Sequence, residues 1–221
     1  GLLKTFLLWA LNKKYSYNND FISFKKPPKF RTDEIALNYE QVEIIYNHDF
    51  TKNKRLEKVR DLFVFGCTTG MRFGNYSTIS KSDIDGDFIR VIDLKSKSKN
   101  LAIPLNSISK SILEKYDYNL PSITNQKMNE YIKEVFQELK FTDEIKKTMK
   151  YGDELVEMKS EFWERISSHT ARRSFITIMK NKRVPDKVIM SYTGHTSLEV
   201  FNAYYRPSEE DKVNYMNEVF K

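Results

Sequence analysis

Three short stretches of the chain carry arginine and histidine side chains whose types and spacing suit phosphate chemistry. The first contains Arg72, the second contains His169 and Arg172, and the third contains His195. Two guanidinium groups can hold both non-bridging oxygens of a phosphodiester and neutralise the charge that develops on them. A tyrosine hydroxyl can serve as the nucleophile, and a histidine or lysine can move the protons. These residue types predict phosphoryl transfer without a metal ion.

The sequence argues against other common catalytic sites. The histidines at 169 and 195 have no carboxylate at ligand spacing, which argues against zinc, and His48 lies in a polar stretch typical of a solvated loop. The chain has no Gly-x-Ser-x-Gly stretch, no glycine-rich phosphate loop and no cluster of aspartates for two magnesium ions. We therefore expect no cofactor and no metal.

The three stretches resemble, in order and spacing, the catalytic boxes of the tyrosine recombinases, the phage integrase family. The matching residues are Thr69-Gly70-Met71-Arg72, His169-Thr170-Ala171-Arg172-Arg173-Ser174-Phe175, Thr193-Gly194-His195-Thr196-Ser197 and Tyr204. Two further segments are similar to integrases of conjugative and mobilisable transposons, namely Phe65-Gly66-Cys67-Thr68-Thr69-Gly70 and Ile103-Pro104-Leu105. The resemblance covers roughly residues 39–205.

The resemblance implies a role for each matching side chain. Arg72 and Arg172 would clamp the phosphate, and His169 would be the acid or base. His195 would donate a hydrogen bond to the scissile phosphate, and Tyr204 would be the nucleophile.

The sequence departs from the family pattern at two places. Counted back from Pro104, the spacing usual in the family places its catalytic lysine at Ser96, so the loop differs in length here. We expect Lys97 to be the catalytic lysine, with Lys95 as the alternative. The side chains expected to contact DNA are Lys95, Lys99 and Arg173. Asn75 stands where the family usually has an acidic residue, so the orientation of Arg72 is expected to depend on another contact.

Helical periodicity chooses between two adjacent tyrosines. Leu198, Phe201 and Tyr205 lie at i, i+3 and i+7, which predicts a buried stripe. Tyr204 lies about 100° away from Tyr205 on a helix with 3.6 residues per turn. Its hydroxyl is therefore expected to be the freer of the two.

The spacing of apolar residues predicts the elements that hold the first box. Helices are predicted over 39–47, 55–67, 108–116 and 124–139, with Gly70 breaking the pattern after the second. β-Branched residues predict two strands, 88–94 and 101–105, joined by the lysine-rich loop. Residues 141–162 are highly charged and predict an exposed hairpin or excursion.

The other two boxes also have helix signals around them. A serine at 167 or 168 is expected to cap a helix at His169, and Pro185 to begin a helix that Gly194 ends, with residues 188 and 189 facing inward. A capping box at 196–199 predicts a helix that Pro207 ends. The apolar residues after it, including Phe220, could dock on a neighbouring protomer or on their own domain.

The resemblance implies a mainly α fold with a small antiparallel β-sheet (α+β), the tyrosine recombinase catalytic-domain fold, over residues 27–221. Residues 1–26 hold one amphipathic helix and an extended connector. Since a single helix cannot form a core, we expect this segment to be the C-terminal helix of a core-binding domain and its linker.

The composition indicates a folded, basic protein of 221 residues. Lys and Arg number 37 against 30 Asp and Glu, which gives a net charge of +7 and a pI near 9.2. The 15 Phe, 13 Tyr and 2 Trp exclude a disordered chain. The single cysteine, Cys67, excludes a disulfide framework and indicates a reducing compartment. No stretch is long and apolar enough to span a bilayer, so we expect a cytoplasmic protein. The resemblance implies a bacterial protein that is associated with the nucleoid while acting.

The resemblance also implies the partners and the reaction. The substrate would be double-stranded DNA attachment sites, bound by a homotetramer of the full-length protein, with an accessory DNA-bending protein as a further partner and no membrane. DNA would be cut and rejoined through a 3′-phosphotyrosyl intermediate, for integration or excision of a mobile element. Two alternatives stay open, a type IB topoisomerase that relaxes supercoils by the same chemistry and an inactive DNA-binding module.

Overall fold

The computed structural model describes residues 2–25, 34–92, 100–152, 154–205 and 207–220. The helices are α1 (Leu2–Asn12), α2 (Tyr39–Asn47), α3 (Lys54–Thr69), α4 (Phe73–Tyr76), α5 (Ser107–Lys115), α6 (Asn125–Glu138), α7 (Ser168–Asn181), α8 (Asp186–Thr193), α9 (Leu198–Asn202) and α10 (Glu209–Val219). The strands are β1 (Ile84–Asp85), β2 (Phe88–Ile92), β3 (Asn100–Pro104), β4 (Glu144–Tyr151) and β5 (Glu154–Glu161), and short 3₁₀ turns lie at Asp20–Ile22, Lys81–Asp83 and Phe162–Arg165.

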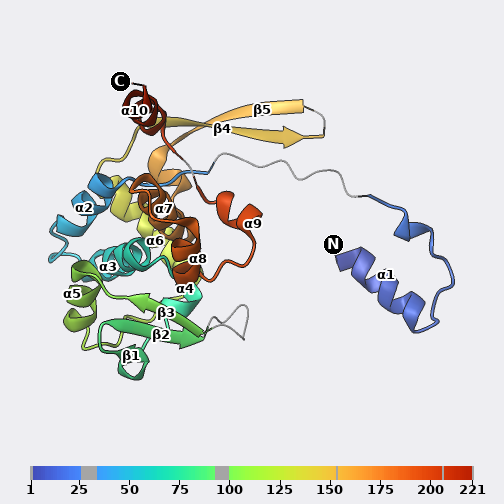
Figure 1. The fold of residues 1–221 in the computed structure, drawn as a ribbon, viewed down its shortest axis with the longest axis horizontal. Coiled ribbons are helices and arrows are strands. Elements are labelled where there is room, and N and C mark those ends of the chain that lie inside the picture. The colour runs from blue at the N-terminus through green and yellow to red at the C-terminus, as the bar shows by residue number, and fades with distance from the viewer. Residues whose placement is uncertain (1, 26–33, 93–99, 153, 206, 221) are drawn as a thin grey trace.

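Helix α3 forms the centre of the molecule and packs against α2, α5, α6 and α7 (Figure 1). Its residues from Val59 to Cys67 are all buried, so this part of the helix is covered on every face. This buried core holds the C-terminal end of α3 in place. The helix is closed there by Gly70, two residues before Arg72. The structure confirms the prediction of a mainly α fold with small antiparallel sheets.

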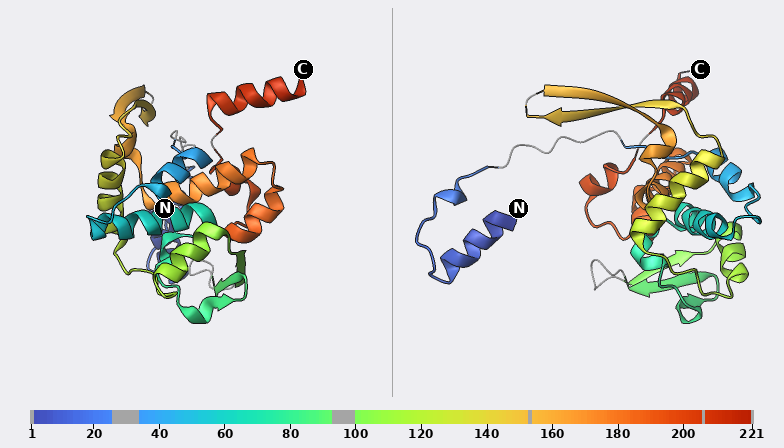
Figure 2. Two further views of the ribbon diagram at one scale, coloured as in Figure 1. Left: turned by 90° about the vertical axis from the view of Figure 1, so that its left-hand side faces the viewer. Right: turned by 180° about the vertical axis from the view of Figure 1, so that it is seen from behind.

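Two antiparallel sheets lie at opposite ends of the helical body (Figures 1 and 2). The first has the order β1-β2-β3, with Ile89 paired to Ile103 and both side chains in the core. Strand β1 was not predicted, because two residues are too few to show a period. The second sheet is the β4–β5 hairpin, which confirms the prediction for 141–162 and extends away from the body with exposed side chains.

The C-terminal helices differ from the prediction in length and in exposed faces. Helix α9 ends at Asn202 instead of continuing to Pro207, and Leu198 is 53% exposed, so the predicted buried stripe was wrong at this residue. Of the two α8 residues predicted to face inward, Ile189 is buried, whereas Val188 is exposed. Helix α8 has its last turn closed by Gly194 in the left-handed conformation, as predicted.

Helix α10 contacts its own domain through its polar residues. The Tyr215 hydroxyl donates to the carbonyl of Lys180 at 3.4 Å, and Arg183 pairs with Glu218. Phe220 remains exposed.

Helix α1 is set apart from the helical body in Figure 1. Lys4 Nζ donates to the carbonyl of Ile22 at 2.8 Å, so α1 folds back on the 3₁₀ turn that follows it. The domain boundary expected between residues 26 and 27 stays a prediction. Within the described residues, no helix combines the length and the apolar character needed to cross a membrane.

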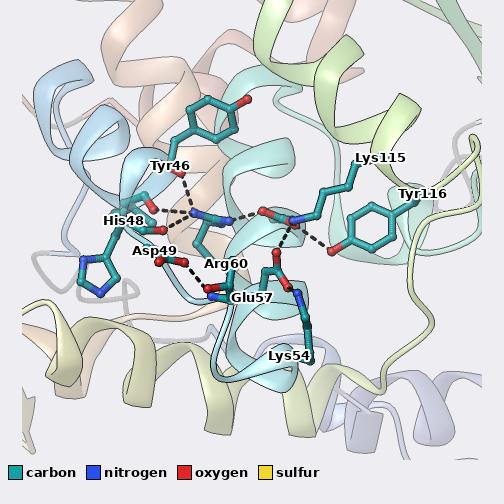
Figure 3. A network of polar contacts seen from close by, with 11 residues as sticks. Tyr46, His48, Asp49, Lys54, Glu57, Arg60, Lys115 and Tyr116 are labelled. Carbon is teal, nitrogen blue, oxygen red and sulfur yellow. Dashed lines mark hydrogen bonds and ion pairs between the residues drawn. The ribbon is translucent and has the colours of Figure 1, made fainter.

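A buried network of charged groups joins α2 to α3 (Figure 3). Arg60 Nη1 donates to the carbonyls of Tyr46 at 2.5 Å and His48 at 2.8 Å, which are backbone acceptors at the C-terminal end of α2. Arg60 Nε donates to Asp61 at 2.6 Å. The guanidinium therefore caps one helix while it is held on another.

The same network reaches α5 through Asp61. This carboxylate also accepts from Lys115 Nζ at 2.6 Å and from the Tyr116 hydroxyl at 2.7 Å. Burial, followed by the hydrogen bond to Asp61, raises the pKa of Tyr116 well above its ordinary value, so the phenol stays protonated as a donor. Through Asp61 and the adjacent Arg60, the network thus joins α2, α3 and α5 near the middle of α3.

Replacing Asp61 with alanine should lower the free energy of unfolding by about 3–5 kcal/mol, because it leaves the Arg60 guanidinium buried without its carboxylate. The matched control is Glu134→Ala on α6, which breaks the solvent-exposed pair with Arg55 of α3 and should cost less than about 1 kcal/mol. Urea denaturation curves measure both values. Equal losses for the two variants would contradict the role given to the buried network.

Candidate active site

The Arg172 side chain lies at the meeting point of the three sequence boxes. It projects inward from the first half of α7, where it is 1% exposed. Its Nη1 donates to the carbonyl of Gly70 at 2.8 Å, and its Nη2 donates to the carbonyl of Thr193. The same Nη2 lies 3.4 Å from both ring nitrogens of His195. One guanidinium therefore contacts segments more than a hundred residues apart.

The two carbonyls that Arg172 contacts are both at the C-terminal ends of helices. Gly70 is the residue that closes α3, and Thr193 is the last residue of α8. Carbonyls at these positions lack partners within their own helix, and the helix dipole makes that end negative. This arrangement compensates a positive charge that would otherwise be costly to bury.

Gly70 can occupy its position only as glycine. Its φ is +67°, in the left-handed region, and its N–H donates to the carbonyl of Gly66 at 3.0 Å to close the helix. A Cβ atom at this position would lie 2.3 Å from the ring of Phe175. The sharp turn directs the next residues, so that Met71 enters the core and Arg72 begins α4.

A cavity of about 420 Å³ lies over this turn, and predicted site residues line it. Its lining residues are Arg72, Phe73, Gly74, Asn75, Asn125, Ser168, His169 and Arg172. Arg72 is half-buried, and His169 is exposed in the first turn of α7. Two guanidinium groups at the N-terminal end of a helix form an electropositive hollow that suits a phosphate group.

His195 and Tyr204 lie on the other side of the Arg172 guanidinium. His195 follows the left-handed Gly194, is 7% exposed, and contacts Thr193 Oγ1 through Nδ1 at 2.9 Å. Its ring centroid lies 5.0 Å from that of Tyr204, and Arg172 Cζ lies 6.0 Å from the Tyr204 ring. His195 lines a neighbouring hollow of about 540 Å³ rather than the cavity over Gly70.

The structure thus brings five of the predicted site residues together around one guanidinium. These residues are Arg72, His169, Arg172, His195 and Tyr204. The roles assigned to them stay predictions. In the described part of the chain, no three histidine, cysteine, aspartate or glutamate side chains gather into a group that could hold a metal ion.

Tyr204 remains the better candidate nucleophile, although not for the reason that the periodicity suggested. Both tyrosines follow the end of α9, so they do not share its helical face. The Tyr205 hydroxyl donates to Asn181 Oδ1 at 3.1 Å, and burial raises the pKa of Tyr205 to about 12. Among the described residues, the Tyr204 hydroxyl makes no hydrogen bond, which leaves it available to a substrate.

The remaining predicted residues lie partly outside the described structure. Lys95, Lys97 and Lys99 fall in the segment 93–99, outside the described residues. Arg173 is half-buried, its Nη1 donates to the carbonyl of Ile35 at 3.1 Å, and its Cζ lies 6.0 Å from the Tyr204 ring. Its contact with DNA stays a prediction.

The sequence analysis did not predict that Asn125 and Ser168 line the cavity. Ser168 Oγ donates to Asn125 Oδ1 at 2.8 Å, and Ser168 N–H donates to Asn129 Oδ1 at 2.8 Å, so the start of α6 is fastened to the start of α7. Neither Asn125 nor Ser168 belongs to a recognisable motif. The sequence signals were a helix predicted to begin at residue 124 and a serine cap at 167 or 168, and neither says what the two helix ends face.

Comparison with known proteins places this geometry among enzymes that act on DNA. The family model described as "Phage integrase family" matches residues 36–211. The tyrosine recombinase XerC of Rickettsia bellii (strain OSU 85-389) is 24% identical over 212 residues, which cover 93% of this chain and 67% of that protein. The chain therefore spans about two thirds of the length of the curated relative.

Three solved structures share the fold. The XerA recombinase has a TM-score of 0.62 and 14% identity, covering 87% of this chain and 66% of that one. A lambda integrase dimer bound to a COC′ core site has a TM-score of 0.63 and 16% identity, covering 90% and 69%. The Tn1549 transposon integrase in complex with a circular intermediate DNA has a TM-score of 0.62 and 15% identity, covering 98% and 76%.

Replacing Gly70 with alanine should lower the free energy of unfolding by about 3 kcal/mol, because left-handed backbone strain adds to overpacking against Phe175. Gly86→Ala is the control. Gly86 also has a positive φ, +58°, but has open space around it, so only the backbone cost of about 1 kcal/mol applies. Thermal or urea unfolding measures the difference, and equal losses would show that the contact with Phe175 does not constrain the turn.

Proposed function

Because the chain belongs to the phage integrase family of tyrosine recombinases, we propose that it forms the catalytic centre of a site-specific DNA recombinase that cuts and rejoins DNA through a 3′-phosphotyrosyl intermediate. The observation that carries this proposal is the position of Arg172, which contacts the Gly70 turn, the Thr193 carbonyl and His195 while it lines a cavity with Arg72. The cellular role would be the integration or excision of a mobile element.

In the proposed reaction, the Tyr204 hydroxyl oxygen attacks the phosphorus of a DNA phosphodiester. Arg72 and Arg172 hold the non-bridging oxygens and stabilise the charge of the transition state. His169 accepts the phenol proton, and Lys97 donates a proton to the departing 5′-oxygen. His195 donates a hydrogen bond to the same phosphate.

The second half of the reaction reverses the first. The 5′-hydroxyl of the partner strand attacks the phosphotyrosyl phosphorus and displaces the tyrosine oxygen, which recovers its proton. The number of phosphodiester bonds is unchanged, and water is not consumed. The energy of the broken bond is therefore conserved in the ester, as strand exchange requires.

The proposed partners follow from the related structures that contain DNA. The lambda integrase dimer is bound to a core site, and the Tn1549 integrase to a circular intermediate DNA. For this protein we infer that residues 27–221 form the catalytic domain, that residues 1–26 end a core-binding domain, and that the two domains enclose duplex DNA. Four protomers would act on two attachment sites, with an accessory DNA-bending protein, on the bacterial chromosome in the cytoplasm.

Replacing Tyr204 with phenylalanine should abolish the covalent adduct with a nicked suicide DNA substrate that carries the cognate site, because the variant lacks the attacking oxygen. Tyr205→Phe is the matched control and should retain the adduct, since its hydroxyl is bound to Asn181. Denaturing gel electrophoresis detects the adduct. Loss of the adduct in Tyr205→Phe alone would reverse the assignment.

Plasmid relaxation and DNA binding, measured beside the adduct, separate the proposal from the two alternatives. A topoisomerase would relax supercoiled plasmid that lacks the cognate site, and an inactive module would bind cognate DNA without forming an adduct. Either result would contradict the proposed recombinase. A steep loss of binding with salt is expected in every case, because phosphate contacts release counterions.

Replacing Lys97 with alanine should slow cleavage by about 10²–10⁴-fold, because the leaving 5′-oxygen loses its acid. A substrate with sulfur in place of that bridging oxygen should restore the rate, since a thiolate leaves without being protonated. Lys99→Ala should lower affinity without rescue by the sulfur substrate. Rescue of Lys95→Ala instead of Lys97→Ala would assign the acid to the neighbouring lysine.

A further inference from the structure

The Thr193 side chain contacts two groups, and each contact bears on the chemistry of His195. Its Oγ1 lies 2.9 Å from the carbonyl oxygen of Ile189, four residues earlier in α8. The same Oγ1 lies 2.9 Å from Nδ1 of His195. Thr193 is fully buried and His195 nearly so, so neither contact is shared with bulk water.

The number of hydrogens available decides the direction of each hydrogen bond. A threonine hydroxyl has one hydrogen to donate, and a backbone carbonyl can only accept. Both contacts can be hydrogen bonds at once only when the hydrogen of Thr193 points to Ile189 and the Thr193 oxygen accepts from His195. In that arrangement Nδ1 of His195 carries a hydrogen.

Two further neighbours of the ring, Arg172 and Phe201, do not select a tautomer. Arg172 Nη2 lies 3.4 Å from both Nδ1 and Nε2, so the guanidinium sits over the ring without preferring either nitrogen. Phe201 packs against the ring with 5.6 Å between centroids and offers no polar atom. The Thr193 hydroxyl, by contrast, contacts Nδ1 and so distinguishes the two nitrogens.

We propose that Thr193 is a positioning residue that holds His195 as the Nδ1–H tautomer, so that Nε2 is the ring nitrogen that meets the scissile phosphate. The inference rests on the recombinase function proposed above. In this tautomer the neutral ring has only a lone pair at Nε2, and the phosphate oxygens also only accept. His195 therefore donates to the phosphate only when the ring is protonated.

Several charged or titratable groups face His195 and set the background for any pH dependence. Arg172 comes from α7, Tyr204 follows α9, and Asp186 and Lys187 from α8 line the hollow beside the ring. All four are present in every variant compared below. Differences between variants therefore report on the hydroxyl of Thr193 alone.

The tautomer can be measured directly by ¹⁵N NMR of the imidazole nitrogens in the full chain labelled with ¹⁵N-histidine. The wild type and Thr193→Ser should show neutral His195 with its hydrogen on Nδ1. Thr193→Val has nearly the same shape but no hydroxyl, and its neutral ring should shift toward the Nε2–H form. A wild type with the hydrogen on Nε2, or a tautomer unchanged in Thr193→Val, overturns the proposal.

Thr68→Val is the matched control for the loss of a threonine hydroxyl. Thr68 Oγ1 donates to the carbonyl of Val64, four residues earlier in α3, at 3.0 Å, in the same way that Thr193 bonds within α8. This variant should leave the His195 nitrogen signals unchanged. A shift as large as that of Thr193→Val would mean that the signals follow general destabilisation, which overturns the assignment.

The pH profile of DNA cleavage gives an independent readout. In Thr193→Val the neutral ring can donate from Nε2, so the ratio of the wild-type rate to the variant rate should fall several-fold as the pH rises and the ring loses its proton. Thr193→Ser should follow the wild type at every pH. A ratio that stays constant with pH overturns the proposal. Failure of every protein to form the DNA adduct would contradict the recombinase function, whereas the NMR result would still decide the tautomer.

Discussion

The arrangement of the site depends on one buried positive charge, the guanidinium of Arg172. Burying such a group without compensation is costly. Here it is compensated by the C-terminal ends of two helices, α3 and α8, whose carbonyls at Gly70 and Thr193 accept its hydrogen bonds. Since both helix ends would otherwise have unsatisfied carbonyls, the guanidinium and the helices stabilise one another. The contact also requires that both helices stop at this point, which they do at the left-handed residues Gly70 and Gly194.

This constraint explains how residues far apart in the sequence form one site. Helix α7 directs Arg172 inward to the two helix ends, and three residues earlier it exposes His169 at its first turn. The turn after α3 then places Arg72 beside the same cavity. The chain after α8 returns to bring the His195 and Tyr204 rings against the other side of the guanidinium. The buried core around α3 supplies the rigidity, and the network at Asp61 joins the middle of that helix to α5.

Local signals in the sequence predicted the helices, their stops and most of the hairpins, because these depend on short-range patterns. Glycines at 70 and 194 end helices where expected, and Ser167 begins α7. The prediction was wrong where tertiary contacts decide the outcome. Helix α9 stops at Asn202, so the periodicity used to separate the tyrosines did not apply. Asn125 was missed, because only the contact between α6 and α7 brings it to the cavity. Family boxes named the site residues, but they could not show that Arg172 caps two helices.

The most direct measurement is a crystal structure of the protein grown in the presence of sulfate, whose oxygens resemble those of a DNA phosphate. We expect the ion within hydrogen-bond distance of both Arg72 and Arg172, near His169. In the same structure, Arg172 should still donate to the carbonyls of Gly70 and Thr193. A sulfate bound elsewhere while this cavity stays empty, or an Arg172 side chain turned away from the two helix ends, would contradict the central place given to this guanidinium.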